Sequence, residues 1–292
     1  MKILITGGSG FIGKNLFEYF SERYDCFAPT HKELELLDEN AVMHFFKVNR
    51  FDTLIHSAGI PFSRKIKDPK NVAFGNLKMF FNIVRNNAYF SKMIFLGSGS
   101  EYDLRYAISK VKEADSERSV PADELGFSKY VCSKYIEKSD NIINLRLFGV
   151  FGKYEDYHIR FISNAICKAV YNLPITIKQN RFFSYLYIDD LCSIVEYFIT
   201  HNARHKIYNA VPNETVDLVS VAQKVNRLSK KNLEIIVHTP GLGKEYTADN
   251  SLLVDEIGDS NFTPLEEAIT KLYDWYEENK KNINPELLTY DP

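Results

Sequence analysis

A tyrosine and a lysine stand four residues apart in the segment "YVCSK", as Tyr130 and Lys134. This spacing places both side chains on one face of a helix. A phenol with its ordinary pKa of about 10 exchanges protons poorly at neutral pH, but a neighbouring ammonium favours the phenolate and lowers that pKa. Ser98, in "FLGSGSEY" at the end of an expected strand, offers a hydroxyl that can hydrogen-bond a substrate carbonyl or alcohol. These three residues predict proton transfer at such a group.

A glycine-rich loop follows the first expected strand in "KILITGGSGFIG", where Gly7, Gly10 and Gly13 are spaced by three. The first glycine permits a tight turn, the second admits a pyrophosphate close to the backbone, and the third lets helix and strand approach. The first residues of the following helix would be Gly10, Phe11 and Ile12. Their free N–H groups and the positive end of the helix dipole favour a phosphate. The loop predicts a bound dinucleotide.

The end of the second expected strand bears on which dinucleotide is bound. Folds that use NAD usually place an acidic residue there, on the ribose 2′-hydroxyl. This chain has Pro29, Thr30, His31 and Lys32 instead. No carboxylate is present there to repel a 2′-phosphate, and two potentially cationic groups would attract it. We therefore expect NADP, with NAD as the alternative. On a second interpretation His31 and Lys32 belong to a solvated loop and cofactor choice is loose.

The bulk composition excludes several other classes of function. The 292 residues carry a formal net charge of −2, which gives no overall reason to bind nucleic acid or a membrane. No apolar run reaches the roughly 18 residues of a membrane span, and the glycine turn interrupts any leader-like run. The four cysteines are scattered without metal-ligand spacing, so we expect reduced thiols, no metal site and a cytoplasmic protein.

The first half alternates short apolar runs with helical patterns, which is typical of a parallel sheet covered by helices. The expected strands are Lys2–Thr6, Tyr24–Pro29, Thr53–Ser57, Met93–Gly97 and Ile142–Phe148. After Gly152 the pattern becomes irregular and rich in aromatic residues. In "YLYIDDL" we expect a strand end followed by a helix whose first turn carries Asp189 and Asp190, which favour the helix dipole.

Motifs across nearly the whole length resemble the extended short-chain dehydrogenases/reductases of the epimerase/dehydratase group, especially GDP-L-fucose synthases and dTDP-4-keto-rhamnose reductases. They occur in family order as "TGGSGFIG", "IHSAG", "GNLKMFFNIV", "FLGSGSEY", "YVCSK", "LRLFGVFG", "YLYIDDL" and "YNAVPNETVDLVSVA". The resemblance implies an α/β fold with a Rossmann-type doubly wound parallel sheet in residues 1–151. Residues 152–292 then form mainly a smaller substrate-binding domain, with 185–202 returning to the first.

The resemblance also implies roles for particular residues. Ser98, Tyr130 and Lys134 would form the catalytic triad, with Lys134 also holding the nicotinamide ribose. Ala58 and Gly59 would lie beside the cofactor. Subunits of the family commonly pair through helices that include the one carrying Tyr130, so a homodimer is expected.

Three reactions dominate this group: 4-epimerisation, 4,6-dehydration and reduction of a 4-keto sugar. Related dehydratases carry an acidic pair, or a Ser-Glu pair, directly after the triad Ser or Thr. Gly99 and Ser100 stand there in this chain, and Glu101 comes one residue late, on the opposite face of a strand end. The sequence therefore disfavours dehydration.

Fucose synthases add a Cys and a His that epimerise carbons beside the ketone. Ser100 stands at the Cys position, and a serine hydroxyl is a far weaker base than a thiolate. His158 falls near the His position and is a candidate general acid, although a lone histidine is more often structural.

Two usual contacts to the nucleotide sugar are also replaced. An Asn becomes Gly149, and the Arg six residues before Asp189 becomes Phe183. Arg160 and Arg181 are the candidates to reach a diphosphate, unless they are surface charges.

The sequence therefore predicts an NADP(H)-dependent reductase of a 4-keto nucleotide sugar, acting in deoxysugar or surface polysaccharide synthesis. Ser98, Ser100, Arg160 and Arg181 are its expected substrate contacts. The alternatives are a nucleotide-sugar 4-epimerase and, from another class, a non-catalytic NADP-sensing regulator.

Overall fold

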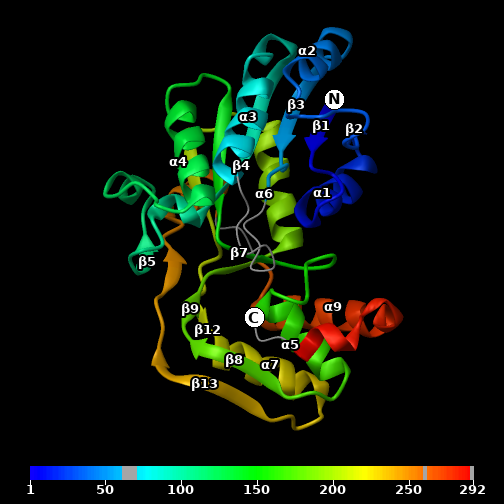
Figure 1. Ribbon diagram of the computed structural model, residues 1–292, viewed down its shortest axis with the longest axis vertical. Coiled ribbons are helices and arrows are strands. Elements are labelled where there is room, and N and C mark those ends of the chain that lie inside the picture. The colour runs from blue at the N-terminus through cyan, green and yellow to red at the C-terminus, as the bar shows by residue number, and fades with distance from the viewer. Residues whose placement is uncertain (61–70, 259–261, 290–292) are drawn as a thin grey trace.

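Two layers of helices sandwich a parallel sheet in the larger lobe of the computed structural model, which describes residues 1–60, 71–258 and 262–289 (Figure 1). Six strands of the described residues form the sheet, in the order β11-β6-β4-β3-β1-β2. Their bounds are β1 Lys2–Thr6, β2 Asp25–Phe27, β3 Phe51–His56, β4 Phe90–Ser98, β6 Ile142–Leu147 and β11 Ile207–Ala210. The predicted doubly wound α/β fold is confirmed, and all five strands expected in the first half are present.

Helices cover both faces of this sheet because alternate strand residues point to opposite sides. The covering helices are α1 Phe11–Ser21, α2 Glu39–Val48, α3 Val72–Val84, α4 Glu124–Ile136 and α6 Ile188–Thr200. Ile3 and Ile5 of β1 belong to the cluster with α1 and α6, while Leu4 packs with α2 and α3. Both faces of the sheet are buried under helices, so the strand sequences are nearly continuous apolar runs.

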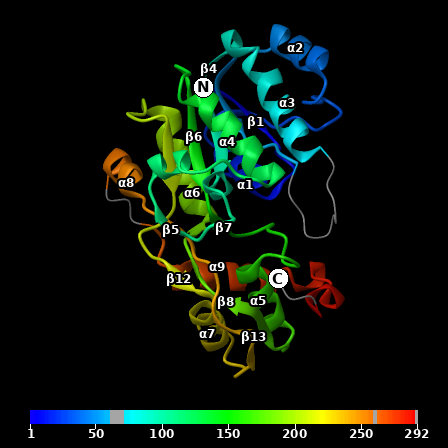
Figure 2. The same cartoon turned by 60° about the vertical axis from the view of Figure 1, so that its left-hand side comes forward.

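The smaller lobe lies below the carboxyl edge of the sheet (Figure 2). Its helices are α5 Phe161–Val170, α7 Leu218–Ser229 and α9 Leu265–Glu278, whereas α8 Ser251–Ile257 packs against β11 of the large sheet. Its strands are β5 Ile108–Val111, β7 Gly149–Phe151, β8 Ile175–Asn180, β9 Phe182–Phe183, β10 Tyr185–Tyr187, β12 Val216–Asp217, β13 Ile235–Leu242 and β14 Tyr246–Ala248. Short 3₁₀ turns are η1 Asn87–Tyr89, η2 Gly99–Tyr102, η3 Glu113–Glu117, η4 Lys280–Asn282 and η5 Pro285–Thr289.

The chain crosses between the lobes several times after residue 151. Helix α6 packs against α1 and β4, and β11 pairs with β6 as an edge strand of the large sheet. The segment 207–210, expected in the smaller domain, thus joins the larger one. The strand-to-helix junction expected in "YLYIDDL" is present, but the carboxylate of Asp190 binds the N–H and hydroxyl of Thr263 instead of capping its own helix.

A buried ion pair fixes the carboxyl end of β4. Arg146 of β6 donates from Nε to the Glu101 carboxylate at 2.6 Å, and neither side chain is exposed to solvent. The remaining guanidinium donors reach Tyr102, the Glu113 carbonyl, Ser116 and Ser133 at 2.8–3.1 Å. The Glu101 carboxylate also accepts from the backbone N–H of Ser98 and from Asn144. One network therefore joins β4, β6, η2, η3 and α4.

We expect Arg146→Met to lower the free energy of unfolding by about 3–5 kcal/mol, because it leaves the Glu101 charge buried without its partner. Arg118→Met is the matched control: Arg118 pairs with Asp115 but is 76% exposed, so its loss should cost at most about 1 kcal/mol. Urea denaturation of the two variants measures the difference. Equal effects would contradict the structural role assigned to this pair.

Candidate active site

The glycine loop has the close contacts that its sequence predicts. Gly7 has a φ of +74°, and a Cβ on it would lie 2.7 Å from the backbone N of Ala58. A Cβ on Gly13 would lie 2.2 Å from the carbonyl oxygen of Gly7, so only glycine lets α1 pack this tightly on the loop. Ala58 and Gly59 follow β3, and the backbone of Ala58 borders the loop at Gly7. The first turn of α1, from Gly10 through Phe11 and Ile12, contains no carboxylate that would repel an anion.

The two potentially cationic residues expected to contact the cofactor, His31 and Lys32, follow the end of β2. His31 and Lys32 are exposed, as a contact to a ligand requires. The His31 ring lies 3.7 Å from the Glu35 carboxylate. The Glu33 carboxylate, at the same turn, accepts 2.8 Å hydrogen bonds from the Thr30 N–H and hydroxyl. An acidic group is therefore present at this turn, engaged by Thr30.

A large cavity of about 840 Å³ opens between the lobes at the carboxyl end of β4. All four residues predicted to bind substrate line it, namely Ser98, Ser100, Arg160 and Arg181. Ser98 ends β4, Arg160 precedes α5, and Arg181 lies between β8 and β9. Lys178 and Lys244 also line the cavity and add positive charge. The arrangement suits a substrate with a reactive group at one end and anionic groups at the other.

The structure does not bring Tyr130 and Lys134 to this cavity with Ser98. The Lys134 ammonium pairs with Glu137 at 2.8 Å and with Glu117 at 3.3 Å, and it lies 5.6 Å from the Tyr130 ring. The residues of α4 that turn toward the sheet edge are Leu125, which lines the cavity, and Lys129.

The physical reason is the rotation of a helix by about 100° per residue, which turns Tyr130 and Lys134, five positions after Leu125 and Lys129, about 140° away from them. Lys129 donates from Nζ to the Leu96 carbonyl at 2.7 Å and lies 4.4 Å from the Phe95 ring. Burial lowers the pKa of Lys129. Leu125 of α4 lines the cavity, and Lys129 follows it by four residues. The pair with the expected spacing at the cavity is therefore a leucine and a lysine.

The N-terminus of α4 is held firmly in this orientation. Asp123 caps the helix by accepting from the Gly126 N–H at 2.8 Å. A Cβ on Gly126 would lie 2.6 Å from the carbonyl oxygen of Ser100, so helix and β4 end are in direct backbone contact. Leu125 therefore faces the cavity as a consequence of main-chain packing.

His158 is not among the described residues that line the cavity. Its ring lies 3.3 Å from the Asp156 carboxylate and packs edge-on against Tyr157. Its neighbour Glu155 does line the cavity, is buried, and lies 2.5 Å from the Ser163 hydroxyl. Burial raises the pKa of Glu155 to about 8. Sequence reasoning missed Glu155, since no motif distinguishes it from a surface glutamate.

The structure gives a physical reason for two further departures from the family pattern, at Gly149 and at Glu101. A Cβ on Gly149 would lie 2.8 Å from the ring of Tyr185, so that ring occupies the space of any longer side chain. Glu101 is engaged in the buried pair and does not line the cavity, which agrees with the sequence argument against dehydration.

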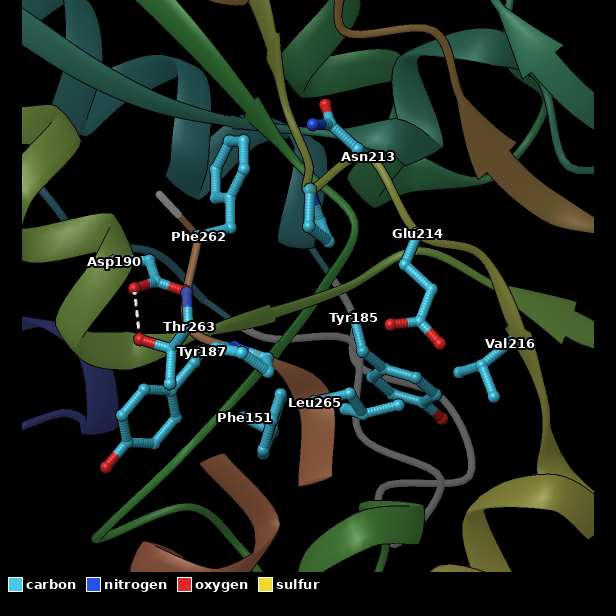
Figure 3. A pocket seen from close by; sticks show the side chains of 12 residues that line it. Phe151, Tyr185, Tyr187, Asp190, Asn213, Glu214, Val216, Phe262, Thr263 and Leu265 are labelled. Carbon is cyan, nitrogen blue, oxygen red and sulfur yellow. Dashed lines mark hydrogen bonds between the residues drawn. The ribbon is translucent and has the colours of Figure 1, made fainter. Parts of the chain in front are cut away.

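A second cavity, of about 280 Å³, lies behind the same wall (Figure 3). Phe151 and Tyr185 line both cavities and so separate them. Two carboxylates line it, Asp190 and Glu214, and that of Asp190 accepts from the Thr263 hydroxyl at 2.7 Å. Aromatic and aliphatic side chains make up most of the remaining lining.

Comparisons with known proteins place the chain in a family. The model of the NAD dependent epimerase/dehydratase family matches residues 3–210. The chain belongs to this family of enzymes, which confirms the resemblance drawn from the motifs.

Individual relatives are more distant. The chain is 23% identical to GDP-L-colitose synthase of Yersinia pseudotuberculosis, over 97% of this chain and 100% of that protein. The structure is similar to a GDP-mannoheptose C4 reductase of Campylobacter jejuni with NADP bound, with a TM-score of 0.81, 20% identity, and 94% and 98% of the two chains covered. It is equally similar to a UDP-glucose 4-epimerase of Thermotoga maritima, with a TM-score of 0.81 and 16% identity over 96% and 100% of the chains.

The two lysines of α4 make different predictions for cofactor binding. Lys129→Met should weaken binding of a nicotinamide dinucleotide about 10- to 100-fold, the usual loss for a charged hydrogen bond. Lys134→Met should leave it unchanged, because its ammonium already pairs with two carboxylates. Isothermal titration with NADP⁺ and NAD⁺ measures both, and melting curves check that the variants fold. Loss of affinity in Lys134→Met alone would restore the original pair.

Glu155 predicts a pH-dependent stability. Its pKa is raised in the folded protein, so the folded state binds more protons than the unfolded state between the ordinary carboxyl pKa and about 8. Stability should therefore fall as pH rises through this window, by at most roughly 1.4 kcal/mol per pH unit, and level off above it. Glu155→Gln should remove this contribution, whereas Glu39→Gln, at an exposed position, should not. Denaturation at pH 5 to 9 measures the slope, and an unchanged slope in Glu155→Gln would contradict the assignment.

Proposed function

We propose that the protein is an NADP(H)-dependent reductase of a 4-keto nucleotide sugar, acting in deoxysugar or surface polysaccharide synthesis. The observation that carries this proposal is the cavity in which Ser98, at the carboxyl end of a parallel strand, faces Arg160 and Arg181 of the other lobe. In open α/β sheets ligands bind at this edge. The family and the reductases among the similar proteins support the same reaction class.

The described residues fit a dinucleotide. Gly7 and Gly13 leave a backbone cradle that any Cβ would fill, and the first turn of α1 offers N–H groups to a pyrophosphate. Ala58 and Gly59 would border the same ligand, and Lys129 would hold the ribose near the reacting end. We favour NADP because His31 and Lys32 are exposed at the end of β2 and because Thr30 engages Glu33.

When bound, the reduced cofactor supplies a hydride to a keto carbon. The chain's own residues position that carbon and supply the proton. Ser98 hydrogen-bonds the carbonyl oxygen, and its backbone is fixed by the 3.0 Å hydrogen bond from its N–H to Glu101. Ser100 donates to Ser98 Oγ at 2.9 Å, which orients the Ser98 hydroxyl toward the cavity.

The nucleotide end of the substrate would lie against the cationic wall. A guanidinium can bind a diphosphate through two parallel hydrogen bonds, so Arg160 and Arg181 suit this role. The ring of Tyr185 fills the space beside Gly149, and Phe183 lines the cavity. We infer that the sugar is held by aromatic surface where the family pattern has polar contacts.

Reduction is favoured over the alternatives by two observations. Ser100 offers only an alcohol at the position where fucose synthases carry a Cys, and His158 turns to Asp156. A 4-epimerase remains the second candidate, because it shares the fold and the cofactor site. The comparisons give no support to a non-catalytic regulator.

We further propose a cytoplasmic homodimer that binds neither nucleic acid nor membrane. Phe74 of α3 is 65% exposed, and Phe127 and Tyr135 of α4 are about 40% exposed, which gives these helices an apolar outer surface for a second copy. No helix among the described residues is long and apolar enough to cross a membrane.

A panel of 4-keto nucleotide sugars, each offered with NADPH and with NADH, tests the function. We expect one sugar to be reduced to its 4-hydroxy product, with NADPH preferred, and Lys32→Ala to lower the NADPH/NADH ratio of kcat/KM about tenfold. Lys47→Ala, on α2, is the control for a change of overall charge. An unchanged ratio would remove Lys32 from cofactor choice.

The same assay decides between the alternatives. Tightly bound oxidised cofactor and interconversion of 4-hydroxy sugars would indicate the epimerase. Cofactor binding without turnover of any sugar would contradict an enzyme of either kind.

A further inference from the structure

The proposed reduction needs a proton donor, and α4 does not supply a phenol to the cavity. Leu125 lines the cavity where a donor on this helix would be expected, and a leucine side chain carries no proton to give. Tyr130 lies five residues further along, rotated about 140° from Leu125 on a helix. The reaction therefore requires another acidic group near Ser98.

The hydroxyl of Tyr246 lies against the end of β4. Its hydroxyl oxygen would lie 2.6 Å from a Cβ on Gly99, the residue that follows Ser98, so only a glycine leaves room for it. Its ring packs 4.9 Å from that of Phe148 and 5.8 Å from that of Phe183. Ser98, Leu125 and Tyr246 all line the same cavity.

The backbone of Tyr246 holds it in this position. Tyr246 pairs with Ile108 of β5 on one side and with Phe183 of β9 on the other, and its carbonyl accepts from Ser184 N–H. A phenol on the middle strand of a sheet is preorganised, so little reorganisation is needed when a substrate arrives.

The hydroxyls of Ser100 and Ser98 form a chain of hydrogen bonds to the Tyr246 hydroxyl. Ser100 donates to Ser98 Oγ, and Ser98 hydrogen-bonds the Tyr246 oxygen. Burial raises the pKa of Tyr246, while the Ser98 hydrogen bond opposes that rise. The phenol is therefore protonated at neutral pH, which is the state that a donor needs. The other charged groups facing this oxygen are Arg160, which favours the phenolate, and Glu101 and Asp123, which disfavour it.

We propose that Tyr246 of the smaller lobe is the proton donor of this site, in place of a tyrosine on α4. This proposal rests on the reductase function proposed above. The keto carbon receives a hydride from the dihydronicotinamide, and the carbonyl π pair moves to the oxygen. That oxygen takes the proton of Tyr246 Oη–H, and the phenolate is reprotonated through Ser98 and Ser100 from water. One ketone, one reduced cofactor and one proton give one alcohol and one oxidised cofactor.

Three variants test the assignment through turnover. Tyr246→Phe should lower kcat about 10²- to 10⁴-fold, the usual share of a general acid, with little change in cofactor affinity. Tyr130→Phe, the matched control on α4, should stay within about threefold of the wild type. Tyr246→Phe combined with Leu125→Tyr should regain at least tenfold of the lost rate, because it returns a phenol to the helix. Full turnover by Tyr246→Phe, or its loss in Tyr130→Phe, would overturn the proposal.

A readout that needs no sugar keeps the two proposals separate. With 3-fluorotyrosine placed at position 246 or at 130, fluorine NMR follows the titration of each phenol with and without NADP⁺. The positive charge of a bound oxidised nicotinamide should lower the pKa of the phenol at 246 by about one unit or more and leave that at 130 unchanged.

The outcomes point to different conclusions. If no keto sugar is reduced but position 246 responds to NADP⁺, the proposed function fails while Tyr246 remains the phenol of the cofactor site. If the cofactor binds and only position 130 responds, the Tyr246 proposal fails. If neither NADP⁺ nor NAD⁺ binds, both proposals fail.

Discussion

The buried pair of Glu101 and Arg146 is the constraint on which the site depends. A carboxylate and a guanidinium without solvent are tolerated only when each hydrogen-bonding position is filled, and here five elements contribute the partners. Because one of those partners is the backbone N–H of Ser98, the electrostatics of the core also set the position of the serine that faces the cavity. A Cβ on Gly97 would lie 2.1 Å from Asn144 Oδ1, so the strand immediately before Ser98 is bound by the same network.

Elements with a strong local signal could be predicted from the sequence. The strand, loop and helix around Gly7 and Gly13 follow from hydrophobic pattern and glycine geometry, and the expected first strand agrees with β1 at both ends. Arg160 and Arg181 were reached from the pattern of a family, and the fold brings them to one cavity with Ser98 and Ser100. Ser98 ends β4 and Arg181 lies between β8 and β9, so the positions of these two residues follow from nearby strand ends.

The placement of Tyr130 and Lys134 away from the cavity could not be predicted in this way. Two lysines, Lys129 and Lys134, lie on one helix of 13 residues, and the choice between them depends on which face meets the sheet. That face is set by contacts with η2 and by the Asp123 cap, which no spacing within the helix reveals. Tyr246 is harder still, since it comes more than a hundred residues later and meets Ser98 only through the pairing of β14 with β5 and β9.

The attachment of Tyr246 to a second sheet has a consequence for how the site can be altered. Ser98 ends a strand of the large sheet, whereas Tyr246 belongs to the four-stranded sheet of β12, β9, β14 and β5. A substitution that disturbs the pairing of β14 with β5 or β9 would therefore displace the phenol and leave the dinucleotide loop intact. A tyrosine on α4 would instead depend on the packing of that helix against the large sheet. Cofactor binding and proton supply can thus change independently of each other in this chain.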